Sequence, residues 1–199
     1  MSLRKKRITL ARISALPVVL LAVFVRPTWG AESTIAFCVE SAGYLFLLGG
    51  LAIRMWSILY IGGRKSHELV TDGPYSLCRN PLYVGTFLLV VGAGLCFENL
   101  LMLAAAFLVM APVHLLTTRM EERHLLELFP DSYPEYARRV PRFWPRLRNY
   151  RGGDNVAVRV RAIRRMAIDA SGVLLIPVVE DLVEILQRHE IVPVLFRFP

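Results

Sequence analysis

Long apolar runs, separated by short polar connections, dominate the sequence. Four runs stand out, at residues 13–25, 35–61, 82–97 and 100–116. Several of them approach the roughly 20 residues that an α-helix needs to cross a hydrocarbon core of about 30 Å. Backbone groups inside lipid must be hydrogen-bonded within the protein, which favours helices over open sheets. The pattern predicts an all-α integral membrane helical bundle with about four transmembrane helices.

The third and fourth runs are separated only by Glu98 and Asn99. So short a connection predicts an antiparallel helical hairpin, as in up-and-down bundles. Both outer ends of this hairpin then return to the same side of the membrane. The polar, basic and turn-rich segment 62–80 precedes the hairpin and is predicted to be cytoplasmic.

The N-terminal region allows two interpretations. Residues 1–12 are basic, and the apolar run 13–25 that follows them contains Pro17 and leads to the small-residue stretch 28–31. This order is typical of a secretory signal peptide, and equally of a short first transmembrane helix with a positive cytoplasmic flank. The helix is favoured because further spans follow at once. We therefore divide the chain into an N-terminal helix and external loop (1–34), a membrane core (35–148) and a C-terminal extension (149–199).

The C-terminal third is more polar. An amphipathic helix is predicted to continue the fourth run to Phe129, and the Pro- and aromatic-rich segment 130–148 is predicted to be irregular and to follow the membrane surface. Segment 156–168 interleaves arginines with apolar residues, which is typical of an interfacial basic element. The apolar run within 171–199 is too short to span. The extension is thus predicted to be basic and amphipathic.

Composition and charge agree with a membrane location. Of the 199 residues, 55% are hydrophobic, and the mean hydropathy is +0.46. The net charge of +8 comes almost entirely from arginine, but no nucleic-acid recognition motif accompanies it, so we expect no nucleic-acid partner. Nearly all basic residues lie in the predicted cytoplasmic segments, and the external loops hold only Arg26. This distribution predicts contact with membrane lipids and a bacterial cytoplasmic (inner) membrane protein whose N-terminus is cytoplasmic.

A first polar cluster lies immediately before the third apolar run, within residues 73–85. Asn80 and Pro81 form a good helix start, because Asn satisfies free backbone donors and Pro loses no hydrogen bond at the first helical position. The N-terminus of that helix suits an anionic group of a ligand, and Arg79 adds a cation beside it. Tyr83 lies three residues into the helix.

A second polar cluster, Glu121 and Glu122, closes the fourth run. A carboxylate here can bind a ribose diol, an ammonium group or a sulfonium-bearing cofactor. Because the hairpin returns both clusters to one side of the membrane, we expect them to form one cytoplasmic-side pocket. The cysteines (Cys38, Cys78 and Cys96) and the scattered histidines have no metal-ligand spacing, so we expect no metal.

These segments carry a family resemblance. The stretches 67–75, 79–85 and 121–122, followed by 129–136 and 139–141, resemble in order and spacing the isoprenylcysteine carboxyl methyltransferase and phospholipid methyltransferase superfamily. The resemblance covers roughly residues 45–147. It implies a helical integral membrane methyltransferase that uses S-adenosylmethionine and acts on a lipophilic methyl acceptor.

The resemblance also implies roles for individual residues. Arg79, Tyr83 and Glu121 are the expected catalytic residues. The cofactor is expected to contact His67, Glu68, Leu69, Val70, Tyr75, Asn80, Pro81, Leu82, Tyr83, Glu121 and Glu122.

Two positions depart from the isoprenylcysteine enzymes. Asn80 replaces their usual histidine, although many bacterial relatives also have asparagine, and Thr117 stands where a substrate-side arginine is expected.

Two other functions remain open at this point. A membrane reductase of the sterol or steroid type, which uses NADPH, has a similar Asn-Pro-x-Tyr region, but the chain is short for that class and the paired glutamates fit the methyltransferases better. A non-catalytic membrane interaction protein with a retained fold is the second alternative. The sequence does not indicate an oligomeric state.

Overall fold

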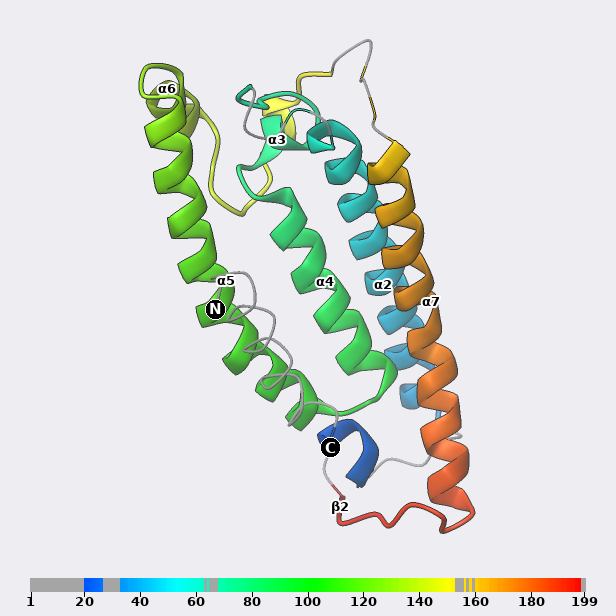
Figure 1. Cartoon of the computed structure of the whole chain (residues 1–199). Helices are drawn as coiled ribbons and strands as arrows, with labels where there is room; N and C mark the ends of the chain where they lie inside the picture. The colour runs from blue at the N-terminus through cyan, green and yellow to red at the C-terminus, as the bar shows by residue number, and fades with distance from the viewer. Residues whose placement is uncertain are drawn as a thin grey trace, which may run out of the picture. The chain divides into compact units, whose positions relative to one another are not determined.

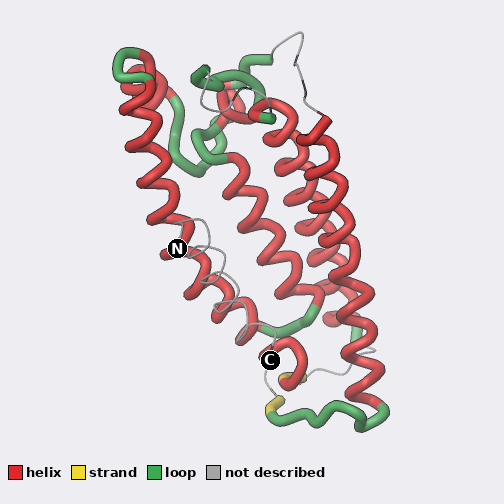
Figure 2. The backbone as a smooth tube through the Cα atoms, viewed as in Figure 1, coloured by secondary structure: helices red, strands yellow, loops and turns green. Residues whose placement is uncertain are grey.

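The computed structural model describes residues 20–26, 33–62, 64, 68–152, 156, 158 and 160–197. Helices make up most of this part of the chain (Figures 1 and 2). They are α2 (Thr34–Ile61), α3 (Pro74–Leu77), α4 (Pro81–Cys96), α5 (Leu100–Leu128), α6 (Ser132–Arg139), the 3-10 helix η1 (Leu147–Asn149) and α7 (Val160–Arg188). Two short strands, β1 (Val25–Arg26) and β2 (Phe196–Arg197), pair in parallel.

The predicted apolar spans correspond closely to helices. Run 35–61 becomes α2, and the two runs around Glu98 and Asn99 become α4 and α5, joined by residues 97–99 as a helical hairpin. Of these helices, α2 and α5 are long and apolar enough to cross a membrane. The 16 residues of α4 would extend only about 24 Å at a rise of about 1.5 Å per residue, short of a hydrocarbon core of roughly 30 Å.

The first predicted span lies mostly outside the described residues. Its described end is helical through Phe24 and then enters β1, so the helix does not continue to Val25 as predicted. The choice between a retained helix and a signal segment depends on residues 1–19 and 27–32, which also lie outside the described part.

The C-terminal predictions need two corrections. Segment 130–148 is not wholly irregular, because α6 forms within it and places the buried Tyr133 and Tyr136 on one face. The basic segment and the apolar segment that follows it are not separate elements either: both belong to α7, a single helix of 29 residues. Helix α7 continues through Pro177, a residue that usually kinks or breaks a helix.

The structure consists of two compact units. The first contains the described residues of Met1–Leu47, Val90–Pro112 and Leu174–Pro199, and the second contains those of Leu48–Leu89 and Val113–Val173. Helices α2, α4, α5 and α7 contribute residues to both units. In the first unit, β1 pairs with β2, and Gln187 Nε2 donates to the carbonyl of Val23 (2.8 Å).

In the second unit, the segment after α6 lies beside the segment that precedes α4. The amide of Gly73 donates to the carbonyl of Arg151 (2.7 Å), and the amide of Arg79 donates to the carbonyl of Pro141 (2.8 Å). Gly73 has a φ of 56° and lies against the ring of Tyr60, where a Cβ atom would come within 2.3 Å of a ring carbon. The segment that follows α6 therefore fixes the loop that precedes α4.

Helices α2 and α4 approach each other closely through glycines of the second unit. A Cβ atom on Gly50 would lie 2.8 Å from the carbonyl oxygen of Gly85 and 2.9 Å from the amide nitrogen of Leu89. A Cβ atom on Gly85 would lie 2.9 Å from the carbonyl oxygen of Gly50. Small residues at such a crossing let two membrane helices pack backbone against backbone.

This contact gives a matched pair of substitutions. Gly50→Ala should destabilise the purified protein by about 1–2 kcal/mol, because the methyl group meets backbone atoms that cannot move aside. Gly49→Ala is the control, since a Cβ atom there has no neighbour within 4 Å. It should stabilise the protein by up to about 1 kcal/mol through helix propensity alone. Thermal unfolding in detergent measures both, and equal melting temperatures would contradict the close approach of α2 and α4.

Candidate cofactor site

A cavity of about 520 Å³ lies wholly within the second unit. Its wall combines the C-terminal half of α2, the loop before α4, the start of α4, the end of α5, α6 and the start of α7. Polar and charged side chains alternate in it with apolar ones. The lining residues are Arg54, Ile58, Ile61, Glu68, Leu69, Val70, Tyr75, Arg79, Asn80, Leu82, Tyr83, Thr86, His114, Glu121, Glu122, His124, Leu125, Leu128, Tyr133, Tyr136, Arg165 and Asp169.

Glu122 is held between two guanidinium groups. Its Oε1 lies 3.0 Å from Arg79 Nη1 and accepts a hydrogen bond of 3.0 Å from Arg142 Nε. Arg142 Nη2 donates to the other carboxylate oxygen. The hydrogen bond with Glu122 raises the pKa of Arg142 above its ordinary value. This group of three residues joins the loop before α4, the end of α5 and the segment after α6, and we call it the Glu122 triad.

Glu121, on α5, is bound to α4 by a different contact. Tyr83 Oη donates to Glu121 Oε2 over 3.0 Å. The ring of Tyr83 also meets His114 edge to face, with 5.0 Å between the ring centroids. Tyr83 and Glu121, which are 38 positions apart in the sequence, therefore meet in the cavity wall as the hairpin prediction required.

Two tyrosines close the wall beside Arg79. Tyr136 Oη donates to the carbonyl of Tyr75 (2.8 Å), which fixes α6 against the loop before α4. Tyr75 is 6% exposed, and its own hydroxyl has no hydrogen-bond partner among the described residues. Burial raises the pKa of both phenols, so both are protonated donors at neutral pH. The Nε atom of Arg79 is also buried without a partner in this part of the chain.

Unsatisfied buried donors are costly, at about 1–3 kcal/mol each. Tyr75, Arg79 and Tyr133, which all line the cavity, each have one such atom. These atoms are covered, so a polar ligand would bond with them only after a small shift of their side chains. This is the structural observation that most directly indicates a binding site.

Glu68 enters the wall from the loop between α2 and α3. Arg64 binds it through Nε, and Arg64 Nη1 also donates to both carboxylate oxygens of Asp72, at 2.9 and 3.0 Å. These contacts raise the pKa of Arg64 although burial opposes them. A single guanidinium thus binds both Glu68 and Asp72.

The start of α7 and the middle of α2 form another part of the wall. Arg54 Nη1 donates to Thr86 Oγ1 (2.7 Å), and Arg54 Nη2 pairs with Asp169 Oδ2 (2.5 Å). These two contacts fix Arg54 between α4 and α7, where it lines the cavity.

Most of the residues selected from the sequence line the cavity. Those present in its wall are Glu68, Leu69, Val70, Tyr75, Arg79, Asn80, Leu82, Tyr83, Glu121 and Glu122. Pro81 is buried at the start of α4 and is not part of the lining. His67 lies outside the described residues.

Several polar lining residues were not predicted from the sequence. Tyr133 and Tyr136 belong to the segment that resembles the methyltransferase family but were not selected as site residues. Arg54 carried a usable signal, because a charged residue within an apolar helix is usually paired or functional. Asp169 and Arg165 carried little signal, since only the tertiary fold brings α7 to the cavity.

Other reactive groups do not add to the site. Cys78 is buried beside Asn80, and burial raises the pKa of its thiol to about 11, so it is not a thiolate at neutral pH. Within the described ranges, no group of three or more His, Cys, Asp or Glu side chains is placed to hold a metal ion.

Comparison with known proteins identifies the family of the chain. The phospholipid methyltransferase family matches residues 39–132. The nickel-cobalt-cadmium resistance protein NccN of Alcaligenes xylosoxydans xylosoxydans is 34% identical over 197 residues, which is 99% of this chain and 92% of that protein. The cobalt-zinc-cadmium resistance protein CzcN of Cupriavidus metallidurans is 45% identical over 117 residues, 59% of this chain and 54% of that protein.

Named methyltransferases are also among the relatives. The protein-S-isoprenylcysteine O-methyltransferase of Schizosaccharomyces pombe is 36% identical over 77 residues, which is 39% of this chain and 33% of that enzyme. No solved structure matches the chain significantly. The chain belongs to the superfamily of membrane methyltransferases that includes the isoprenylcysteine carboxyl methyltransferases and the phospholipid methyltransferases.

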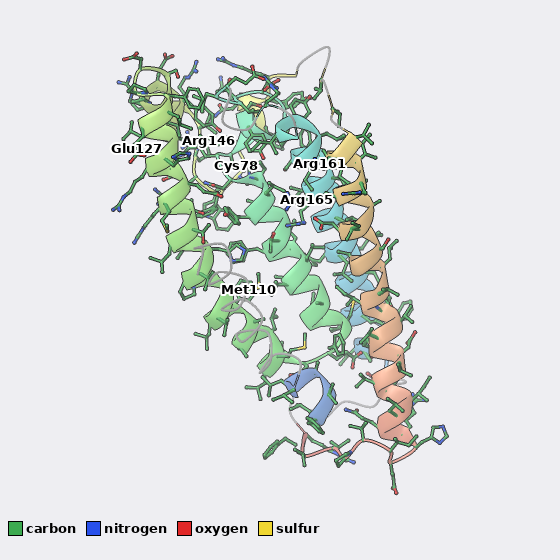
Figure 3. The ribbon with its side chains drawn as sticks, in the orientation of Figure 1. Cys78, Met110, Glu127, Arg146, Arg161 and Arg165 are labelled. Atoms are coloured by element: carbon green, nitrogen blue, oxygen red, sulfur yellow. The ribbon has the colours of Figure 1, made fainter. Side chains whose placement is uncertain are left out.

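The Glu122 triad should contribute strongly to stability. Glu122→Gln removes the charge that two guanidinium groups share, and it should cost about 2–3 kcal/mol, since the side chains of Glu122 and Arg79 are mostly buried. The melting temperature of the full-length protein should fall by roughly 5–10 °C. Glu127→Gln, at the exposed end of α5 (Figure 3), is the matched control and should leave it unchanged. Similar melting temperatures for both variants would show that the triad does not hold these segments together.

Proposed function

We propose that the cavity binds S-adenosylmethionine and that the protein transfers its methyl group to a lipophilic acceptor. The observation that carries this proposal is a cavity lined by the family's motif residues, three of which, Tyr75, Arg79 and Tyr133, have a buried polar atom without a hydrogen-bond partner among the described residues. The family contains methyltransferases, and the cavity of about 520 Å³ lies in the usual range of small-ligand sites.

The lining residues fit the functional groups of this cofactor. Arg79 would hold the cofactor's carboxylate, and Tyr75 would supply a neutral hydrogen bond. The carboxylate of Glu121 would stabilise a cationic group. Leu69, Val70 and Leu82 give the apolar surface that an adenine ring needs.

S-adenosylmethionine supplies a methyl group bound to a cationic sulfur, so no metal and no covalent nucleophile on the protein are required. The residues of the chain align the two reactants and exclude water from them. Tyr83 orients the carboxylate of Glu121 by donating to Oε2. Where the acceptor carries a proton, Glu121 is the residue that would take it up.

A membrane setting follows from the apolar surface. In the apolar window of α5 only 11% of the residues are buried, whereas a core helix of a soluble protein would be mostly covered. We propose that this surface faces lipid, that the acceptor enters from the bilayer, and that the cavity opens to the cytoplasmic side of a bacterial inner membrane. The arginines of the second unit would then follow the positive-inside rule.

The two alternative functions make different predictions. A reductase would bind NADPH, and thermal-shift titration of the two cofactors side by side separates it from a methyltransferase. A non-catalytic interaction protein would tolerate Tyr83→Phe and Glu121→Gln without any change in ligand binding. The family membership favours methyl transfer over both.

Methyl transfer predicts saturable cofactor binding that depends on Glu121. Radiolabelled S-adenosylmethionine should bind the purified protein at one site, and Glu121→Gln should weaken binding about tenfold or more, through loss of a charge-assisted contact.

Mass spectrometry of lipid extracts tests the transfer itself. Extracts from cells with the wild-type protein should contain a species 14 Da heavier than its unmethylated form. That species should be absent with Glu121→Gln.

Glu127→Gln is the matched control for this experiment, because it removes an exposed carboxylate from the same helix. It should retain full cofactor binding. If the folded wild-type protein does not bind S-adenosylmethionine saturably, the proposed function is wrong. If it binds NADPH more tightly than S-adenosylmethionine, the reductase function is favoured instead.

The match to NccN over nearly the whole chain leads us to propose a biological setting. We propose that the methylated lipophilic product supports tolerance to nickel, cobalt and cadmium. Deletion of this gene in its host should lower tolerance to these metals on graded plates. Wild-type protein and Glu127→Gln should restore it, whereas Glu121→Gln should not. If Glu121→Gln restores metal tolerance fully, then metal tolerance does not depend on methyl transfer and this part of the proposal is wrong.

A further inference from the structure

Helix α7 contributes to the cavity although it lies outside the segment matched by the methyltransferase family. The family matches residues 39–132, whereas α7 begins at Val160. Within the second unit, Ala162 and Met166 of α7 form a buried cluster with Ile58 of α2. This packing brings two further α7 residues, Arg165 and Asp169, into the cavity wall.

Asp169 positions a guanidinium group in that wall. Arg54 binds Asp169 through Nη2 and Thr86 through Nη1, so its side chain has a fixed direction. Five N–H donors are present on a guanidinium, and these two contacts leave the others for a ligand. The side chain of Arg54 is 23% exposed, and Arg54 lines the cavity.

Arg165 adds a second cation to the same part of the wall. It lies one helical turn before Asp169 in the N-terminal half of α7, and its side chain is exposed (Figure 3). Among the residues that the structure describes, it forms no ion pair. The cavity wall therefore holds two guanidinium groups from α2 and α7, of which only that of Arg54 is paired with Asp169.

We propose that Arg54 and Arg165, with Asp169 and Thr86 as positioning residues, form a subsite for an oxyanion of the methyl acceptor. The chemical class is a phosphate or carboxylate on an amphiphile, because guanidinium groups bind planar and tetrahedral oxyanions with paired hydrogen bonds. The oxyanion belongs either to a lipid headgroup or to a free anionic compound. This inference rests on the proposed function, since it places the acceptor in the cavity that binds the cofactor.

The probe for this subsite is octyl phosphate, titrated by calorimetry into full-length protein in phosphatidylcholine nanodiscs, with empty nanodiscs subtracted. Octyl phosphate should bind the wild-type protein saturably. Arg165→Gln should weaken binding about tenfold or more, whereas Arg165→Lys, which keeps the charge, should retain most of it. Arg161→Gln is the matched control, since this neighbouring exposed arginine of α7 does not line the cavity (Figure 3).

Arg54→Lys gives a second, independent variant, because it keeps the charge but loses the paired contacts with Thr86 and Asp169. It should weaken octyl phosphate binding as well, and thermal unfolding checks that every variant is folded. Competition by phosphatidylglycerol in the nanodisc would identify a lipid headgroup as the source of the oxyanion. Competition by inorganic phosphate alone would identify a soluble anion.

Titration of S-adenosylmethionine into the same samples separates the two proposals. Cofactor binding without saturable octyl phosphate binding would overturn the oxyanion subsite and leave the proposed function intact. Equal affinity of the wild type, Arg165→Gln and Arg54→Lys for octyl phosphate would also overturn the oxyanion subsite. If the wild-type protein does not bind S-adenosylmethionine, the proposed function itself is wrong.

Discussion

The second unit depends on the carboxylate of Glu122 and the two guanidinium groups that share it. The side chain of Glu122 is only 12% exposed, and a charge so far removed from water is tolerated only when it is paired. Its partners, Arg79 and Arg142, lie before α4 and after α6. The pairing therefore requires segment 140–151 to return to the loop before α4, where the hydrogen bond between Arg79 and Pro141 fixes the backbone.

The same physical rule explains why α7 belongs to the cavity. Arg54 lies in the apolar helix α2, and a cation there needs a partner that the neighbouring sequence does not supply. Asp169, 115 positions away, provides it. Because the ion pair connects α2 to α7 while Thr86 connects the same guanidinium to α4, one side chain sets the positions of three helices.

The sequence was a good guide wherever a structural feature depends on local pattern. Apolar runs predicted α2, α4 and α5 closely, and the hairpin placed Tyr83 next to Glu121 as expected. It was a poor guide to α7, because the basic segment and the apolar segment that follows it were predicted as separate elements, whereas they form one helix. It also gave no indication of the partner of Arg54, since pairing over 115 positions is a property of the tertiary fold.

The cavity wall combines residues inside the segment matched by the family with residues of α7 outside it, which bears on how the protein would select its methyl acceptor. Under the proposed function, the lining residues within the family match, from Glu68 to Glu122, would supply the contacts to the methyl donor. Helix α7 lies outside that match, but it falls within the match to NccN, which covers 99% of the chain. If the shared segment binds the methyl donor as proposed, the added segment is where features that select the acceptor would lie. The charged residues of α7 in the wall, Arg165 and Asp169, are therefore where the acceptor of this branch is best sought.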